Sequence, residues 1–539
     1  MNRSHDWKPG PLWLLLAGVG LTAASAGACG ASDAAAEFAG APGERGADGT
    51  SSGGAAAPGA PEPEREVEPD SEAPVATGNF IWIANPKSGR VAFVDARSLE
   101  VRTVEAGNGP TYLATVPGQA EDTTIVANVL SSDATLLKVT PQGITTKTFK
   151  TAEGANAWAF SADGRYAIAW TDARKVPGAS RQQGFQDLAI LDLAAGTSTI
   201  LAVGYRPVKV GFAAQGATAH AITQDGIAII DLSSAPRVSK NIAVSSNPLE
   251  DPGSRDVSVT PSGSHALIRR DNSSAVTIVA LADGARADAT LTGAVTDLDL
   301  SPAGDRAVAV VRDKSDVSVL PVPGLLAAPT QFTTVTVTGE TIGSVVLANG
   351  GAMGLLFSNG TPVERLTIMD LTKQPATYRT VRVYSPVLGA FPSPDGLHAV
   401  VLHDRTDGPD GSPGAFSLVP TGAEPLPAKI VATQAPMVAV GKTPPPQVVL
   451  ANDRAVVTER DDTKKVYGVY LARLPQLMVE RFPLASPPIA AGLVPAAKRA
   501  FVAQQHPEGR ITFLDLDTGV ARTLTGFELG ARVVDGSKP

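Results

Sequence analysis

Residues 162–170 read Ala-Asp-Gly-Arg-Tyr-Ala-Ile-Ala-Trp, a tight polar turn followed at once by an apolar run. Glycine suits such a turn because it adopts positive φ without steric cost, and the run has the length and residue types of a β-strand. The same turn and run return at residues 261–268, 302–310 and 394–402. The chain therefore contains a repeated turn-and-strand unit.

The spacing of the turn glycines gives the size of this unit. Glycines at positions 164, 216, 263, 304, 350 and 396 lie 52, 47, 41, 46 and 46 residues apart. This period is typical of folds in which one four-stranded antiparallel blade is the repeating unit. The sequence thus predicts an all-β fold of the β-propeller type. Weaker copies occur at residues 215–217, 349–351, 452–455 and 496–502.

A second repeated feature is an apolar run that ends in aspartate. It occurs at Asp95, Asp192, Asp231, Asp370 and Asp515. An aspartate at a strand end can accept hydrogen bonds from the backbone N–H groups of the following turn. We interpret these side chains as turn formers rather than as catalytic groups.

Together the two features resemble YVTN-type and TolB/WD40-like propeller repeats. Residues 80–85 (FIWIAN), continued through residues 89–110, follow the YVTN repeat closely, and residues 393–396 (SPDG) resemble the turn of TolB-like blades. The resemblance covers nearly all of residues 79–533. It implies a fold rather than an activity, because such blades serve many unrelated functions.

The number of blades has several solutions. Repeat units begin near residues 80, 122, 164, 216, 263, 304, 350, 396, 452 and 498, which makes up to ten, whereas most propellers have four to eight blades. We expect one ring of seven to eight blades, with the other units as insertions. One larger ring, two smaller rings, and a β-solenoid or pair of sandwiches are the alternatives.

The first 28 residues have the order of a secretory signal peptide. Basic residues are followed by the apolar run 11–21 and then by small residues that end at Cys29. The stretch Ala26-Gly27-Ala28-Cys29 resembles the bacterial lipobox, with Ala26 where leucine is usual. The resemblance implies lipidation of Cys29 and location in the cell envelope, with Gly30 favouring the outer membrane. A conventional signal with an incidental cysteine is the alternative.

The sequence divides into four parts. Residues 1–28 are the expected signal peptide, and residues 29–78 are the lipidated cysteine followed by a tether rich in Ala, Gly, Pro and Glu. Such a composition cannot bury enough apolar surface to fold, so we expect disorder there. Residues 79–533 are the expected propeller, and residues 534–539 form a C-terminal tail.

Charge and motifs exclude several functions. The net charge is −8, and no basic stripe suited to nucleic acid is present. A single cysteine excludes an intrachain disulfide and a cysteine zinc cluster. The chain lacks the G-x-S-x-G, Walker and Rossmann motifs, and we predict no cofactor. The pair Arg269-Arg270 is interpreted as a solvated face.

No metal site is predicted, but five residues are the candidates if the propeller binds a metal. His265 and His398 stand two residues after their turn glycines, so equivalent places in the repeat could bring them to the central channel. Asp404, Asp407 and Asp410 lie among glycines, as in calcium-binding loops. Ordinary strand residues and a solvated loop are the simpler interpretations, because no recognised metal motif accompanies them.

The sequence favours a membrane-anchored extracytoplasmic propeller that acts as a non-catalytic binding scaffold. Its expected partners are the membrane, through the N-terminal lipid, and a protein or envelope polymer. The alternatives are a hydrolase of the propeller-lactonase type and a solute- or metal-binding protein that uses the central channel.

Overall fold

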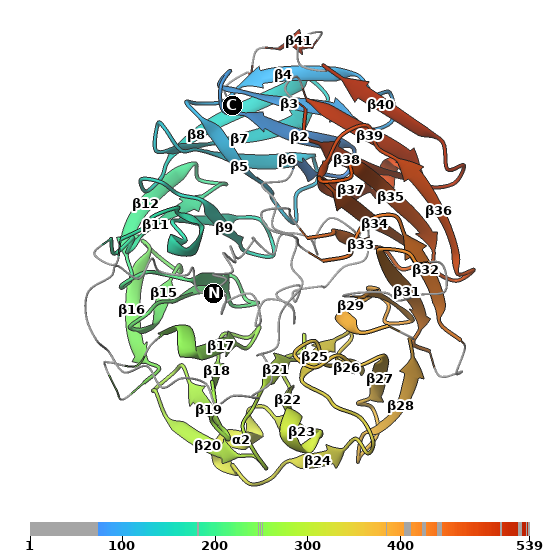
Figure 1. Ribbon diagram of the computed structural model, residues 1–539. Coiled ribbons are helices and arrows are strands. Elements are labelled where there is room, and N and C mark those ends of the chain that lie inside the picture. The colour runs from blue at the N-terminus through green and yellow to red at the C-terminus, as the bar shows by residue number, and fades with distance from the viewer. Residues whose placement is uncertain are drawn as a thin grey trace, which may run out of the picture.

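The chain forms ten antiparallel sheets arranged in a ring, as the blades of a β-propeller (Figure 1). The computed structural model describes residues 74–539 except 181–182, 246, 248–249, 251, 384, 404–410, 423–426, 439–444, 507–508, 527–530, 535 and 537–539. Each blade has four strands consecutive in sequence, the first next to the central axis and the fourth at the rim. Within the described residues the one α-helix is α2 (Gly324–Ala327).

The strands of the first half of the ring are short and regular. They are, in blade 1, β1 (Val75–Ala76), β2 (Phe80–Asn85), β3 (Arg90–Asp95) and β4 (Val101–Glu105); in blade 2, β5 (Pro110–Thr115), β6 (Thr123–Asn128), β7 (Asp133–Thr140) and β8 (Gly143–Lys150); in blade 3, β9 (Ala157–Phe160), β10 (Tyr166–Trp170), β11 (Asp187–Asp192) and β12 (Thr197–Ala202); in blade 4, β13 (Lys209–Phe212), β14 (Thr218–Ile222), β15 (Gly226–Asp231) and β16 (Arg237–Ala243); and in blade 5, β17 (Arg255–Val259), β18 (His265–Arg270), β19 (Ala275–Ala280) and β20 (Arg286–Thr290).

The strands of the second half follow the same plan, with one extra strand at the end. They are, in blade 6, β21 (Asp297–Leu300), β22 (Arg306–Val311), β23 (Asp316–Pro321) and β24 (Thr333–Thr336); in blade 7, β25 (Ser344–Leu347), β26 (Met353–Phe357), β27 (Arg365–Asp370) and β28 (Thr377–Arg382); in blade 8, β29 (Val387–Pro392), β30 (His398–His403), β31 (Gly414–Pro420) and β32 (Lys429–Thr433); in blade 9, β33 (Val448–Leu450), β34 (Arg454–Asp461), β35 (Val466–Arg473) and β36 (Met478–Pro483); in blade 10, β37 (Pro488–Val494), β38 (Arg499–Gln504), β39 (Arg510–Asp515) and β40 (Ala521–Thr525); and last β41 (Arg532–Val533).

Hydrophobic packing between blades holds the ring together. The buried apolar residues fall into ten clusters, and each cluster joins two neighbouring blades. One of them joins blade 10 to blade 1 through Phe501, Phe513 and Val94, all 1% exposed or less. Each fully buried side chain of this kind contributes roughly 1.5–3 kcal/mol. The ring is therefore closed, and it has no interface without a core.

Both repeated sequence features form the turns at one end of the blades. The Ser161 hydroxyl accepts a hydrogen bond from the Tyr166 N–H and donates one to Asp163, which closes the turn around Gly164 at φ +66°. The five strand-end aspartates each accept backbone N–H groups of the next turn, as predicted. For Asp231 and Asp370, hydrogen bonds that include a neighbouring hydroxyl lower the pKa of the carboxyl group.

The structure corrects the expected number of blades. The β-propeller fold is confirmed, but all ten repeat units are complete four-stranded blades, so the preferred count of seven to eight was too low. The innermost strand of blade 1, β1, lies before residue 79, where the sequence placed the start of the domain. Its apolar stretch is only two residues long, too short to stand out from the residues before it.

The ring closes without a blade shared between the chain ends, because blades 1 and 10 each have their own four consecutive strands. Arg97 donates to the backbone oxygen of Ala496 and Arg499 to that of Ala96, both at 2.7 Å. Arginines bridge other blades in the same way, so the junction resembles the remaining interfaces. The strand β41 then pairs in parallel with β4, at the rim of blade 1.

Candidate functional site

The two faces of the ring are built differently. One face, the turn face, carries the turns from first to second and from third to fourth strand, including the five-residue turns 161–165, 260–264 and 393–397. The opposite face, the loop face, carries the turns from second to third strand and the connections between blades. Its connections include residues 171–186 and 244–254. The turn face has two longer connections, residues 322–332 with α2 and residues 421–428.

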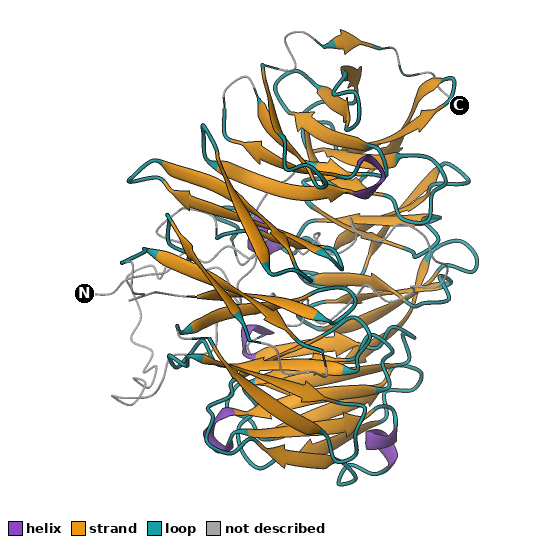
Figure 2. Ribbon diagram, turned by 90° about the vertical axis from the view of Figure 1, so that its right-hand side faces the viewer, coloured by secondary structure: helices purple, strands orange, loops and turns teal. Residues whose placement is uncertain are grey.

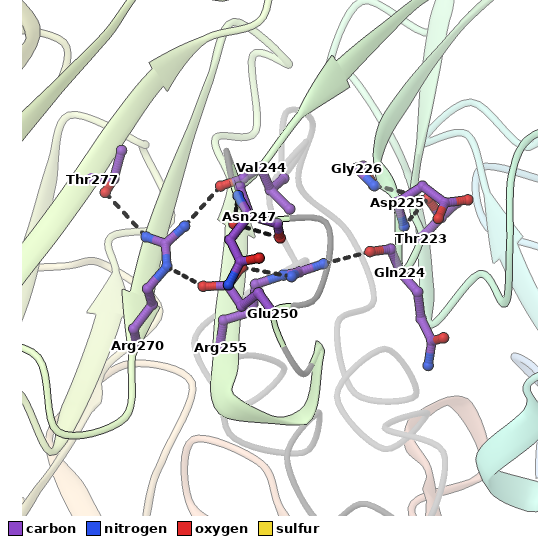
Figure 3. Close-up of polar contacts among 11 residues, drawn as sticks. Thr223, Gln224, Asp225, Gly226, Val244, Asn247, Glu250, Arg255, Arg270 and Thr277 are labelled. Atoms are coloured by element: carbon purple, nitrogen blue, oxygen red, sulfur yellow. Dashed lines mark hydrogen bonds and ion pairs between the residues drawn. The ribbon is translucent and has the colours of Figure 1, made fainter.

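A partly buried ion cluster fixes the loop-face connection 244–254 between blades 4 and 5 (Figure 3). Glu250 accepts hydrogen bonds from Arg255 at 2.8 Å and from Arg270 at 2.5 Å. Arg255 also donates to the backbone oxygen of Gln224 in blade 4, and Arg270 to that of Val244. The cluster thereby ties two blades and their connection into one rigid unit.

The strand register explains why this cluster needs a carboxylate. Arg255 and Arg270 lie directly opposite each other on β17 and β18. Like charges in such positions repel, and the Arg255 side chain is only 5% exposed. Glu250 bridges the two guanidinium groups. Its burial would raise the pKa of the carboxyl group, but hydrogen bonds and charges from Arg270 and Arg255 hold that pKa below its usual value.

A second buried glutamate fixes the connection between blades 8 and 9. Glu459 on β34 is fully buried and accepts from the backbone N–H groups of Gln434 and Ala435, at 2.8 and 3.1 Å. The Tyr470 hydroxyl and the Arg481 guanidinium also donate to it, at 2.9 and 2.5 Å. Burial, together with the Glu459 charge, raises the pKa of Tyr470. The start of this loop-face connection is therefore held from inside the blade.

A third cluster fixes the start of connection 171–186. Asp172, which is 3% exposed, accepts hydrogen bonds from the backbone and side chain of Arg174 at 3.0 Å. The Asn156 side chain accepts from the Asp172 N–H and donates to the Asp172 backbone oxygen. Arg174 reaches on to the backbone oxygen of Val208, on the connection to blade 4. Three loop-face connections thus begin from fixed positions.

Carboxyl groups are buried on two innermost strands. Asp256 on β17 and Asp297 and Asp299 on β21 are 9% exposed or less. Asp297 and Asp299 accept from the backbone N–H groups of Val345 and Leu347 in the next blade, at 2.7 and 2.8 Å. Burial, with the neighbouring carboxylates as a smaller cause, raises the pKa of Asp299 well above its usual value.

The structure does not bring the two candidate histidines together. His265 lies on β18 in blade 5 and His398 on β30 in blade 8, both at the turn face. Burial lowers the pKa of each. Asp404, Asp407 and Asp410 lie outside the described residues, as does Cys29. Throughout the described part of the chain, no group of three His, Cys, Asp or Glu side chains could hold a metal ion.

Two other histidines are buried in the blades. His403 contacts the Ser417 hydroxyl through Nε2 at 2.7 Å. Burial lowers the pKa of both His403 and His220 to about 4, so both rings are neutral at physiological pH. They fill positions on second strands and are not exposed to a ligand.

The residues of the ion clusters were not found from the sequence. Arg270 was interpreted as part of a solvated face, but its side chain is 26% exposed and bonded to Glu250, and that of Arg269 is 12% exposed. The one available signal was position: Arg255 and Arg270 each lie four residues beyond the pair Val259 and Ala266 that flanks the turn, so the hairpin places them opposite each other.

Two pockets lie away from the ion clusters. A pocket of about 380 Å³ lies between blades 6 and 7 at the turn face, with Arg306, Phe332, Lys373 and Gln374 among its lining residues. A smaller one of about 140 Å³ lies in blade 10, next to Arg499 and Arg522. The Arg306 guanidinium is already bonded to Asp305 and to the backbone of blade 7.

Comparison with known proteins gives structural likeness only. No protein-family model matches the chain, and no curated protein sequence matches it. Among solved structures, Kuenenia stuttgartiensis hydrazine synthase is 21% identical over 56% of this chain and 97% of that one, with a TM-score of 0.31. A eukaryotic initiation factor is 11% identical over 76% and 96%, at 0.49. Dihydro-heme d1 dehydrogenase NirN is 11% identical over 78% and 75%, at 0.37.

Proposed function

We propose that this protein is anchored in the bacterial cell envelope through a lipid on Cys29, and that its propeller is a non-catalytic scaffold whose loop face binds a protein or envelope polymer. The difference between the two faces supports this most directly. Most of the irregular connections lie on the loop face, and buried or partly buried ion clusters fix three of them. Rigid elements that position loops are the usual basis of a binding surface.

Fixed loops favour binding because they lose little conformational freedom when a partner docks. Ordering a free side chain costs about 0.5–1.5 kcal/mol, and this cost lowers affinity. At the loop face the Glu250, Glu459 and Asp172 clusters already order parts of three connections in the folded protein, so little ordering remains when a partner binds. We expect little movement of these connections on binding.

The anchor and the tether set where the scaffold works. A tether of the 44 residues before the ring, 30–73, would span on the order of 40 Å as a flexible chain. That reach would let the ring turn its loop face toward partners in the envelope. No helix among the described residues is both long and apolar enough to span a membrane.

Site-specific photo-crosslinking in cells tests the loop-face assignment. A photoreactive amino acid is placed at Lys87 or Thr463 on the loop face, and at Ala195 or Ala303 on the turn face, all exposed positions. We expect adducts of defined mass from the loop-face positions and none from the turn-face controls. Equal crosslinking from both faces, or turnover of a lactone by the purified protein, contradicts the proposal.

The lipid anchor has a separate test. Cells that express the protein are labelled with an alkyne-tagged fatty acid, and the envelope is fractionated. We expect label and membrane association for the natural chain, and loss of both for Cys29→Ser. An unlabelled protein in the soluble fraction would contradict the proposed anchor. The loop-face proposal would still be tested by the crosslinking experiment.

A further inference from the structure

The rim of the ring is basic although the protein is acidic. The ten fourth strands carry eleven Lys and Arg residues and three acidic ones. The whole chain has 45 basic and 53 acidic residues. Charged residues on an edge strand, lysine above all, prevent pairing with other sheets. Protection of the edges therefore accounts for basic residues on the rim, but it does not account for exposed apolar residues beside them.

Exposed apolar side chains gather on one part of the same rim. Among the described residues, five of the eight large exposed apolar ones lie on or directly before the strands β28, β32, β36, β40 and β41, which we call the outer arc (Figure 1). These five are Tyr378 at 37% exposed, Ile430 at 40%, Met478 at 59%, Val520 at 52% and Val533 at 49%.

On most of the outer arc, an apolar residue has an exposed basic residue close by in sequence. These basic residues are Arg382, Lys429, Arg522 and Arg532. Arg379 and Arg481 lie on the same strands but donate to the backbone of Pro420 and to the buried Glu459, and the one acidic residue of these strands is Glu480. The view in Figure 2 faces this side of the ring. Blades 7, 8 and 10 and the added strand β41 thus repeat one combination of an exposed cation and an exposed apolar side chain, and blade 9 between them adds the apolar Met478.

The opposite part of the rim lacks the apolar half of this combination. Strands β8, β16 and β20 carry five basic residues but no large exposed apolar residue, and β12 carries Ile200 without a basic residue. The two parts therefore have similar charge and differ in exposed apolar surface. Binding that needs both charge and apolar surface should therefore involve the outer arc alone, whereas binding by charge alone should involve both parts of the rim.

We propose that the outer arc docks on a lipid surface that carries anionic headgroups. Basic side chains near such a surface contribute about 1 kcal/mol each, and apolar side chains beside them enter the boundary between headgroups and acyl chains. A purely charged polymer would leave the apolar residues exposed, so the combination favours lipid. The proposal goes beyond the loop-face function and does not depend on acylation of Cys29.

Vesicle binding tests the proposal without the lipid anchor. The chain from residue 29 onward, with Cys29→Ser, is sedimented with phosphatidylglycerol-containing vesicles and with phosphatidylcholine vesicles. We expect binding to the anionic vesicles only, weakened by salt. The variant Lys429→Glu/Arg522→Glu/Arg532→Glu is expected to lose at least tenfold in affinity. Ile430→Ser/Met478→Ser is expected to lose affinity with an unchanged salt dependence.

A matched variant separates the outer arc from overall charge. Lys150→Glu/Arg237→Glu/Arg286→Glu changes the net charge equally, but on the opposite part of the rim. We expect it to keep at least half of the affinity, and circular dichroism and thermal unfolding confirm that all variants fold. Equal loss in both triple variants, or no binding of the parent chain to anionic vesicles, overturns the proposal whatever becomes of the loop-face assignment.

Discussion

At the scale of the residue, Asp299 makes stability depend on pH. Its carboxyl group is 1% exposed, and Oδ1 has no hydrogen-bond partner. Because its pKa is raised on folding, the folded protein holds this proton more tightly than the unfolded chain, whose aspartates titrate near 3.9. Raising the pH above that value therefore lowers the free energy of unfolding until the pH passes the pKa of the folded state.

The substitution Asp299→Asn tests this. Asparagine has no such proton to lose and keeps an oxygen for the Leu347 N–H. We expect the free energy of unfolding to rise at pH 8 and to rise by less at pH 4.5, measured by urea titration. The exposed control Asp453→Asn should change it by less than about 0.5 kcal/mol. An equal gain at both pH values would contradict the proposed titration.

Local interactions are the ones that the sequence could predict. The Ser161 and Asp163 turn and the strand-end aspartates act within a few residues, so their pattern is visible in the chain. Glu459 gives no such signal, because its partners Gln434 and Arg481 lie 25 and 22 residues away and meet it only once the blade has formed. The candidate site depends on contacts of this kind, between residues that are far apart in the sequence.

At the scale of the element, Glu459 holds one loop-face connection. Glu459→Ala would leave the Arg481 guanidinium, the Tyr470 hydroxyl and two backbone N–H groups without their acceptor inside the blade. Breaking a buried ion pair in this way costs about 3–5 kcal/mol. We expect that loss in urea unfolding, with faster amide exchange at Gln434 and Ala435.

Glu480, next to Arg481 on β36 but exposed, is the matched control. Its replacement by alanine should change the free energy of unfolding by less than about 0.5 kcal/mol. Unchanged exchange at Gln434 and Ala435 in Glu459→Ala would show that the connection is held by other contacts, and that this glutamate does not preorganise the loop face.

The elements themselves were predictable, but their number was not. Each repeat has a turn and an alternating strand, and these identify a blade. Whether a unit without its glycine, such as the one near residue 498, is a blade or an insertion depends on whether its strands find partners. The hydrogen bonds of β37 to β40 show that it is a complete blade.

At the scale of the whole molecule, three surfaces have separate composition. The turn face holds the repeated motifs, the loop face holds most of the irregular connections, and the strands of the rim carry far more basic than acidic residues. The separation follows from the geometry of a closed ring, because strand ends lie on the two faces and only fourth strands reach the rim. One molecule can therefore bind a partner at the loop face while its rim contacts a different surface.

The C-terminal strand β41 adds to the rim of blade 1, beyond the last strand of that blade. Arg532 and Val533 of β41 pair with Arg102 and Thr103, and the Val534 N–H donates to the Thr103 oxygen at 2.9 Å. Deleting residues 527–539 should lower the free energy of unfolding by about 1–2 kcal/mol, because a few hydrogen bonds are lost while the hydrophobic cluster between blades 10 and 1 remains. Amide exchange should accelerate in β4 and stay unchanged in blades 5 and 6. Faster exchange in every blade would mean that packing alone does not close the ring, and that β41 is required for closure.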